Sequence, residues 1–153
     1  MPDPASPPAS AAPPAPARGE PPRIRFIALR VSRAASGRCR AEVELESIDG
    51  RAICGAADVQ AIAEGDLRAA AAATLDALHQ AGDGRHRFTL LGVKNVRAFD
   101  QHVILVQLSH DGSTDGRPTR LMGSAFADAD LMRATVLAVL NASNRVLWGP
   151  PPG

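Results

Sequence analysis

The sequence has no tyrosine and a single tryptophan, and aromatic residues make up 3% of its 153 residues. Its only lysine is Lys94, so arginine supplies almost all of the positive charge, and the net charge is +1. Proteins that bind nucleic acid usually combine a strong positive field with stacking aromatic side chains. No apolar run approaches the ~20 residues that a membrane-spanning helix needs. We therefore expect neither nucleic acid nor a membrane as a partner.

Motifs for catalysis and for metal binding are also missing. The sequence contains no P-loop, no dinucleotide-binding fingerprint and no Gly-x-Ser-x-Gly elbow. None of the four histidines has the close spacing of zinc ligands, so we expect them at the surface or in turns. They are His79, His86, His102 and His110. The sequence thus predicts no catalytic residue, no metal and no cofactor.

Only two cysteines are present, Cys39 and Cys54, and they fall in neighbouring predicted strands. A disulfide between them is possible, and two reduced thiols in a cytosolic protein are the interpretation that we favour. Residues 1–22 hold nine of the 13 prolines and lack the apolar run of a secretory signal. We predict that they form a disordered leader, that residues 149–153 form a Pro/Gly tail, and that the protein is cytoplasmic.

The remaining residues, 23–148, contain one pattern twice. Phe26-x-x-Leu29-x-Val31 matches Phe88-x-x-Leu91-x-Val93, 62 residues further along the chain. The other matched segments, in the same order, are 43–45 and 106–108, 49–51 and 111–112, 53–57 and 121–125, and 66–67 and 130–131. This order indicates two supersecondary units, about 23–82 and 86–148, which share one core. In such pseudo-symmetric domains, ligands and partners usually bind at the seam between the units.

Each unit is predicted to consist of three strands followed by one helix. The strands are expected at 24–33, 40–48, 51–59, 88–96, 102–109 and 119–127, and the helices at 65–81 and 130–147. Short turns make the strands antiparallel meanders, so the fold class is α+β with two pseudo-symmetric βββα units. Each helix buries one face of its sheet. A dimer, or the packing of one unit on the other, would cover the remaining face.

The sequence also predicts the burial of two strands and the type of one turn. Apolar residues on both faces of 24–33 indicate a strand that is central in its sheet or covered on both sides. In 40–48, Ala41, Val43 and Leu45 alternate with Glu42, Glu44 and Glu46, which predicts one buried and one solvated face. The pair Asp49–Gly50 predicts a type I′ turn.

Two helix starts, at Asp66 and Asp130, permit two interpretations. Each carboxylate could cap its helix. Alternatively, the free N–H groups of a helix start could bind a ligand carboxylate while a nearby Asp such as Asp128 binds its ammonium group. The glycines at Gly55 and Gly123 fit either interpretation, because glycine also permits close packing of a helix on a strand.

The last helix resembles that of a known family. Members tend to end in Asn-Ala-Leu-Asn-Arg followed by two aliphatic residues, and this chain has Asn-Ala-Ser-Asn-Arg-Val-Leu at 141–147. With the repeated βββα pattern, residues 23–148 resemble the C-terminal regulatory domain of α-isopropylmalate synthase and citramalate synthase. The chain departs from the family at Ala125 or Phe126, where the family has a second glycine, and at Ala129, where it has Ser or Thr. The catalytic barrel, of about 250 residues, is absent.

The resemblance implies a stand-alone, non-catalytic regulatory domain that forms a homodimer and binds an amino acid such as leucine. It also implies a link to branched-chain amino-acid synthesis and a synthase or another protein as partner. The alternative is an interaction scaffold without a small-molecule ligand. The ligand-binding residues that we expect are Gly123, Ser124, Ala125, Asp128 and Asp130, with Gly55 and Asp66 at the equivalent place in the first repeat.

Overall fold

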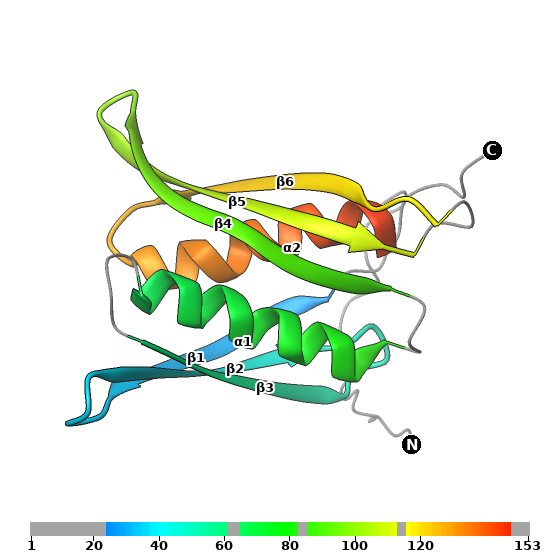
Figure 1. Ribbon diagram of the computed structural model, residues 1–153, viewed down its shortest axis with the longest axis horizontal. Helices are drawn as coiled ribbons and strands as arrows, with labels where there is room; N and C mark the ends of the chain where they lie inside the picture. The colour runs from blue at the N-terminus through cyan, green and yellow to red at the C-terminus, as the bar shows by residue number, and fades with distance from the viewer. Residues whose placement is uncertain (1–23, 61–64, 83–85, 113–115, 148–153) are drawn as a thin grey trace, which may run out of the picture.

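The computed structural model describes residues 24–60, 65–82, 86–112 and 116–147. Its elements are β1 (Arg25–Arg33), β2 (Arg38–Glu46), β3 (Ala52–Gln60), α1 (Gly65–Ala81), β4 (Arg87–Ala98), β5 (Gln101–Asp111), β6 (Thr119–Ala127) and α2 (Leu131–Leu147), as Figure 1 shows. The predicted α+β class with two βββα units is confirmed. The predicted leader and tail lie outside the described residues.

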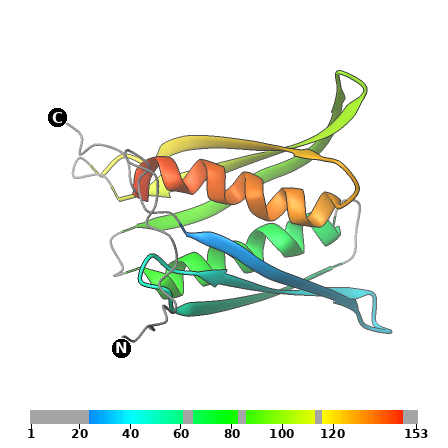
Figure 2. The same ribbon diagram turned by 180° about the vertical axis from the view of Figure 1, so that it is seen from behind.

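The two repeats pack through their helices, which form a middle layer between two separate sheets (Figures 1 and 2). Each sheet is an antiparallel meander, in the orders β1-β2-β3 and β4-β5-β6. α1 lies mainly on β3 and β2, and α2 lies mainly on β6 and β5. Because the helices also contact each other, side chains of both repeats form one core. The helices thus cover the inner face of each sheet, and within the described ranges nothing covers the outer faces.

The central strands carry the alternation that the sequence predicts. On β2, Ala41, Val43 and Leu45 are buried under α1, while the glutamates between them lie on the outer face. On β5, Ile104 and Val106 are fully buried under α2 in the same way. Full burial of an aliphatic side chain of this size contributes roughly 1.5–3 kcal/mol, so these strands hold much of the core energy.

β1 is an edge strand, and the prediction that it is central in its sheet or covered on both sides was wrong. A β-bulge between Phe26 and Ala28 leaves Ile27 without a partner on β2 and shifts the alternation by one residue. Ile27 is therefore 48% exposed although it is apolar. A corresponding bulge in β4 leaves Leu91 44% exposed. The bulges explain why apolar residues fall on both faces of these strands.

The turn at Asp49–Gly50 is not of type I′. Only Gly50 has a positive φ, of 86°, and its N–H donates a hydrogen bond to the carbonyl of Ser47. A type I′ turn needs positive φ at both central residues. That pattern occurs instead between β4 and β5, at Phe99 (54°) and Asp100 (60°).

Two glycines let the helices lie close to their sheets. A Cβ at Gly55 would overlap the carbonyl oxygen of Ala73 on α1, and a Cβ at Gly123 would overlap that of Ala138 on α2. Both glycines are buried at equivalent places in the repeats. Of the two interpretations that the sequence left open for them, the structure shows close helix–strand packing.

Candidate functional site

The two helix starts, which the sequence pattern treats as equivalent, are built differently. α1 begins at Gly65, so Asp66 lies within its first turn. The carboxylate of Asp66 accepts hydrogen bonds from the Arg33 guanidinium and, at 3.1 Å, from the Cys39 thiol. The predicted capping role of Asp66 was therefore wrong, because both of its oxygens bind side chains of the neighbouring strands. The hydrogen bond from Arg33 and that from Cys39 lower the pKa of Asp66.

Asp130 does cap its helix. It precedes the first residue of α2, and its Oδ1 accepts a hydrogen bond of 3.0 Å from the backbone N–H of Arg133. One oxygen is enough for this bond, so the charge of Asp130 stays at the surface. At the helix start, the second repeat thus has an exposed carboxylate, whereas in the first repeat the carboxylate binds Arg33 and Cys39.

The other predicted site residues lie in different surroundings. Gly123 and Ala125 face α2, whereas Ser124 points to the outer side of the sheet and Asp128 is exposed in the turn before α2. The carbonyl oxygen of Ser124 accepts a hydrogen bond of 2.7 Å from the Asn141 side chain. The structure therefore brings only Asp130, of this set, to the cavity described next.

A groove of about 460 Å³ lies between β1 and the first turn of α2, at the seam of the two repeats. We call it the seam groove. It is lined by Phe26, Ile27, Leu29, Val31, Asp130, Met132 and Arg133. α2 contacts β1 less than α1 contacts β4, and the seam groove lies in the space between α2 and β1. Its size lies within the range of small-molecule sites.

The chemistry of the seam groove is mixed. Four apolar side chains of β1 and Met132 form its walls, and Asp130 and Arg133 place opposite charges at its rim. The Arg133 guanidinium lies 5.6 Å from the centroid of the Phe26 ring, a cation–π distance. No ion pair joins Asp130 and Arg133 among the described residues. The groove therefore offers an apolar surface, one cation and one anion.

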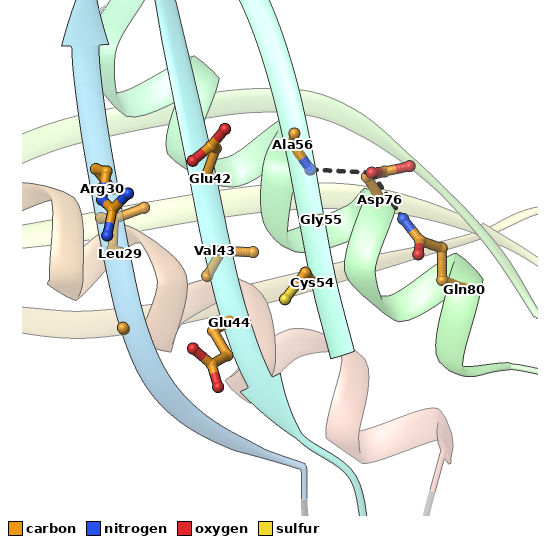
Figure 3. Close-up of a pocket in the computed structure, with 11 residues that line it drawn as sticks. Leu29, Arg30, Glu42, Val43, Glu44, Cys54, Gly55, Ala56, Asp76 and Gln80 are labelled. Carbon is orange, nitrogen blue, oxygen red and sulfur yellow. Dashed lines mark hydrogen bonds between the residues drawn. The ribbon is translucent and has the colours of Figure 1, made fainter. Parts of the chain in front are cut away.

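A second cavity, of about 470 Å³, lies on the outer face of β1–β3 (Figure 3). We call it the outer-face groove. It is lined by small residues such as Ala28, Cys54 and Ala56 and by the larger apolar residues Leu29 and Val43. Glu42 and Glu44 lie beside them (Figure 3). Gly55, one of the predicted ligand-binding residues, also lines the groove, and an apolar lining therefore does not distinguish it from the seam groove.

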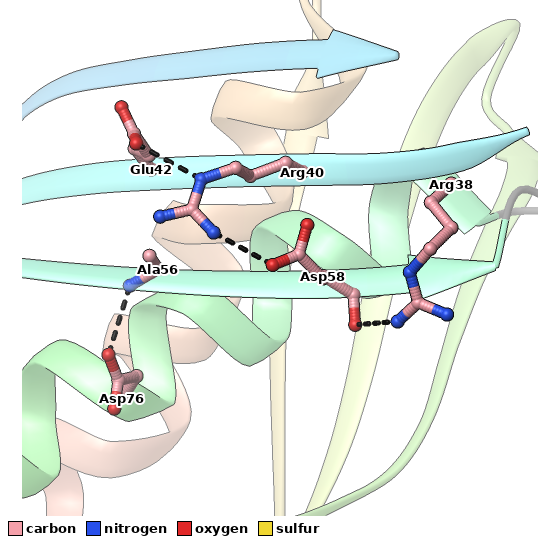
Figure 4. A network of polar contacts seen from close by, with 6 residues as sticks. All are labelled: Arg38, Arg40, Glu42, Ala56, Asp58 and Asp76. Carbon is pink, nitrogen blue, oxygen red and sulfur yellow. Dashed lines mark hydrogen bonds and ion pairs between the residues drawn. The ribbon is translucent and has the colours of Figure 1, made fainter. Parts of the chain in front are cut away.

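Several charged groups around the outer-face groove form ion pairs or hydrogen bonds within the protein (Figure 4). Arg40 pairs with Glu42 at 3.2 Å and with Asp58 at 2.7 Å. The Asp76 carboxylate accepts a hydrogen bond of 3.0 Å from the backbone N–H of Ala56 on the free edge of β3. These contacts satisfy the sheet edge and fix its charges, which is a structural role.

The cysteines lie on opposite faces of β2 and β3 and are both free. Cys39 is fully buried, and burial together with the nearby Asp66 raises the pKa of its thiol to about 11. Cys54 is exposed on the outer face. Of the two interpretations, the structure therefore shows free thiols.

The prediction of surface histidines was wrong for His110, which is 5% exposed. His110 lies with His79 and His86 around the ring of Phe88. Nothing in the sequence spacing brings these residues together, because they come from α1, the start of β4 and the end of β5. In the described part of the chain, no three His, Cys, Asp or Glu side chains are placed to hold a metal ion. No described helix has the length and hydropathy needed to cross a bilayer.

No protein-family model matches the sequence, and no curated protein matches it. The likeness to the synthase regulatory domain rests on the repeated βββα architecture and on the residues at 141–147.

Proposed function

We propose that this chain is a non-catalytic regulatory domain that binds a small amino acid with an aliphatic side chain in the seam groove. The observation that carries the proposal is the composition of that groove. It combines an apolar strand surface from one repeat with the oppositely charged Asp130 and Arg133 from the other. An amino acid has the same three parts: an ammonium group, a carboxylate and, in leucine and its relatives, an apolar side chain.

In this proposal each part of the ligand has a partner. The carboxylate would pair with the Arg133 guanidinium, which is exposed and can leave the Phe26 ring. The ammonium group would pair with Asp130, which keeps one oxygen on the helix N–H. The aliphatic side chain would lie on Leu29 and Val31, which are half-buried on β1.

The first repeat supports this assignment by contrast. The carboxylate equivalent to Asp130 is Asp66, which is already bound by Arg33 and Cys39. α1 also packs more closely on β4 than α2 packs on β1. This asymmetry supports a single effector site per chain, at the start of α2 in the second repeat.

The same proposal places the chain beside α-isopropylmalate synthase or citramalate synthase, in the cytoplasm, as a domain that senses a product of branched-chain amino-acid synthesis. This placement extends the resemblance of the fold and of the last helix.

A thermal-shift screen tests the binding. The probes are leucine, isoleucine and valine, with the related 2-oxo and hydroxy acids, which lack the ammonium group. A ligand at 100-fold over its dissociation constant stabilises the folded state by about 2.7 kcal/mol. We expect a shift in melting temperature with at least one amino acid and a smaller shift with its 2-oxo acid.

Two variants locate the site. Arg133→Gln should abolish the shift, whereas Arg145→Gln, in the exposed last turn of the same helix, should leave it unchanged. Asp130→Asn keeps a good capping side chain while it removes the charge, so it should reduce binding without a large loss of stability. No shift with any amino acid, or an equal shift in Arg133→Gln, would overturn the proposal.

The alternative function, an interaction scaffold, is favoured by a different observation. The outer face of β4–β6 exposes the large apolar side chains Leu91, Val96, Met122 and Phe126. The equivalent places on the outer face of β1–β3 hold Ile27, Ser32, Cys54 and Asp58, of which only Ile27 is a large apolar residue. An apolar sheet face of this kind is typical of a protein–protein contact, and a homodimer is the contact that we propose for it.

A further inference from the structure

Four rings pack together where the end of α1 meets the beginning of β4 and the end of β5. The Phe88 ring is stacked on His79, with centroids 6.2 Å apart, and on His86, at 6.5 Å. His110 lies 5.1 Å from Phe88 and 5.0 Å from His86. His79 belongs to the first repeat and the other three rings to the second, so the cluster joins the repeats at the end opposite the seam groove.

Two hydrogen bonds within the cluster require neutral imidazoles. The backbone N–H of Phe88 donates to Nε2 of His79 at 2.9 Å, so that nitrogen must carry a lone pair. Nδ1 of His86 and Nε2 of His110 are 2.8 Å apart, so one of them donates and the other accepts. Protonation of His79, or of both rings of the pair, removes an acceptor and breaks the corresponding bond.

The surroundings of His110 offer little to stabilise a positive charge. The two titratable groups whose charge acts on His110 are His86, which lies before β4, and Asp111, the next residue on β5. On β6 the residue paired with His110 is the uncharged Thr119. Burial and the neighbouring His86 lower the pKa of His110 from 6.5, against the smaller opposite effect of Asp111.

The sign of the linkage follows from this direction. A histidine with a lowered pKa in the folded state binds its proton more readily in the unfolded state. Its contribution to stability is therefore fully present above the unfolded pKa of about 6.5 and is lost as the pH falls towards the folded value.

We propose that the histidine cluster is a proton-sensitive latch that fastens α1 of the first repeat to β4 and β5 of the second. When the rings are neutral, their hydrogen bonds hold α1 against β4 and β5. A fall in pH through the histidine range separates these elements, because the acceptors on His79 and on the His86–His110 pair are lost together. This device is independent of any ligand in the seam groove.

Urea unfolding of the whole chain between about pH 8 and about pH 5.5, where histidine is the side chain that titrates, tests the latch. One extra proton taken up on unfolding raises the unfolding equilibrium constant about tenfold per pH unit. We expect at least this change for the wild-type protein below about pH 6.5. His110→Gln, whose side chain at this position cannot be protonated, should show a smaller dependence on pH.

The matched control is His102→Gln. His102 lies on the same strand as His110, but it is exposed and contacts Asn95 at 3.1 Å. Its variant should keep the wild-type pH dependence. A wild-type protein with constant stability over this pH range, or a His110→Gln variant with an unchanged slope, would overturn the proposal.

A second measurement on the wild-type protein does not depend on whether the variants fold. The imidazole NMR signals of His110 should titrate below the ordinary histidine value of about 6.5, and the amide of Phe88 should lose protection from hydrogen exchange as the cluster is protonated. If His110 titrates at the ordinary value and the Phe88 amide stays protected, the latch does not exist.

Discussion

Gly55 and Gly123 determine how closely each helix lies on its sheet, because neither position has room for a side chain. Both face a helix carbonyl at a distance that no side chain permits. The alanines opposite them, Ala77 and Ala142, are fully buried. Small residues on both sides thus replace the larger side chains of an ordinary helix–sheet contact, and they explain the high alanine content of α1.

Replacement of Gly123 by alanine should destabilise the protein by about 1–3 kcal/mol, because the added methyl group overpacks a rigid contact. Gly92→Ala is the matched control, since that glycine lies on β4 with no atom near its missing Cβ, and it should change stability by less than about 0.5 kcal/mol. Chemical denaturation of both variants measures the difference. Equal midpoints for Gly123→Ala and the wild type would contradict the close packing.

The two helices begin in chemically different ways although their sequences match. At α1, Asp66 ties β1 and β2 to the helix through Arg33 and Cys39. At α2, Asp130 binds only the helix backbone and leaves β1 apart from the helix. The seam groove therefore lies at the helix start whose aspartate makes no hydrogen bond with the neighbouring strands in the described part of the chain.

The contact at α1 predicts a specific sensitivity to acid. The pKa of Asp66 is lowered in the folded state, so its contribution to stability is present above the unfolded pKa of about 3.8 and is lost as the pH falls through the folded value. Asp66→Asn should lower stability at neutral pH and flatten the loss of stability below about pH 4. Asp128→Asn, at an exposed turn, should change neither. Acid unfolding followed by circular dichroism provides the measurement, and identical acid limbs in the wild type and Asp66→Asn would refute this role.

The elements show which kinds of structure the sequence predicts well. The strict alternation in β2 is a local pattern that fixes which side chains are buried, and the structure confirms it. The edge position of β1 could not be predicted, because the bulge at Ile27 imitates a strand that is apolar on both faces. Likewise, an Asp at a helix start does not reveal whether Arg33 and Cys39, about 30 residues away, will reach it first.

The candidate site was predicted only in part for the same reason. Asp130 could be nominated from the sequence, since a helix start is a local signal. Its apolar companions Phe26, Ile27, Leu29 and Val31 come from β1, about 100 residues earlier, and the sequence gives no sign of that contact. The histidine cluster also depends on three separate elements. Sites of this kind follow from the packing of the two repeats, which local patterns do not encode.

For the whole molecule, the two outer sheet faces are the main departure from its pseudo-symmetry. Outward positions on β6 hold Met122 and Phe126, which are 54% and 61% exposed. The equivalent strand β3 holds Cys54, Ala56 and Asp58 instead. Two copies of the apolar face could pack as aligned sheets, as in a β-sandwich, whereas the charged face would lose its hydration in such a contact.

This asymmetry predicts where the protein associates with itself. We expect a dimer by light scattering, and Phe126→Glu should shift it towards the monomer, because a buried carboxylate without a partner is costly. Glu44→Gln, on the charged outer face, is the control and should leave the mass unchanged. A wild-type monomer at all concentrations, or a Phe126→Glu variant with an unchanged mass, would show that this face is not the interface.

Amide NMR of the whole protein, titrated with leucine, tests whether the seam groove holds an amino acid. We expect saturable shifts in the amides of β1 from Phe26 to Val31 and in the first turn of α2 around Arg133. Amides around Asp76 and Ala56, beside the outer-face groove, should stay in place. An unchanged spectrum at the solubility limit of leucine, or shifts confined to the outer-face groove, would contradict the account.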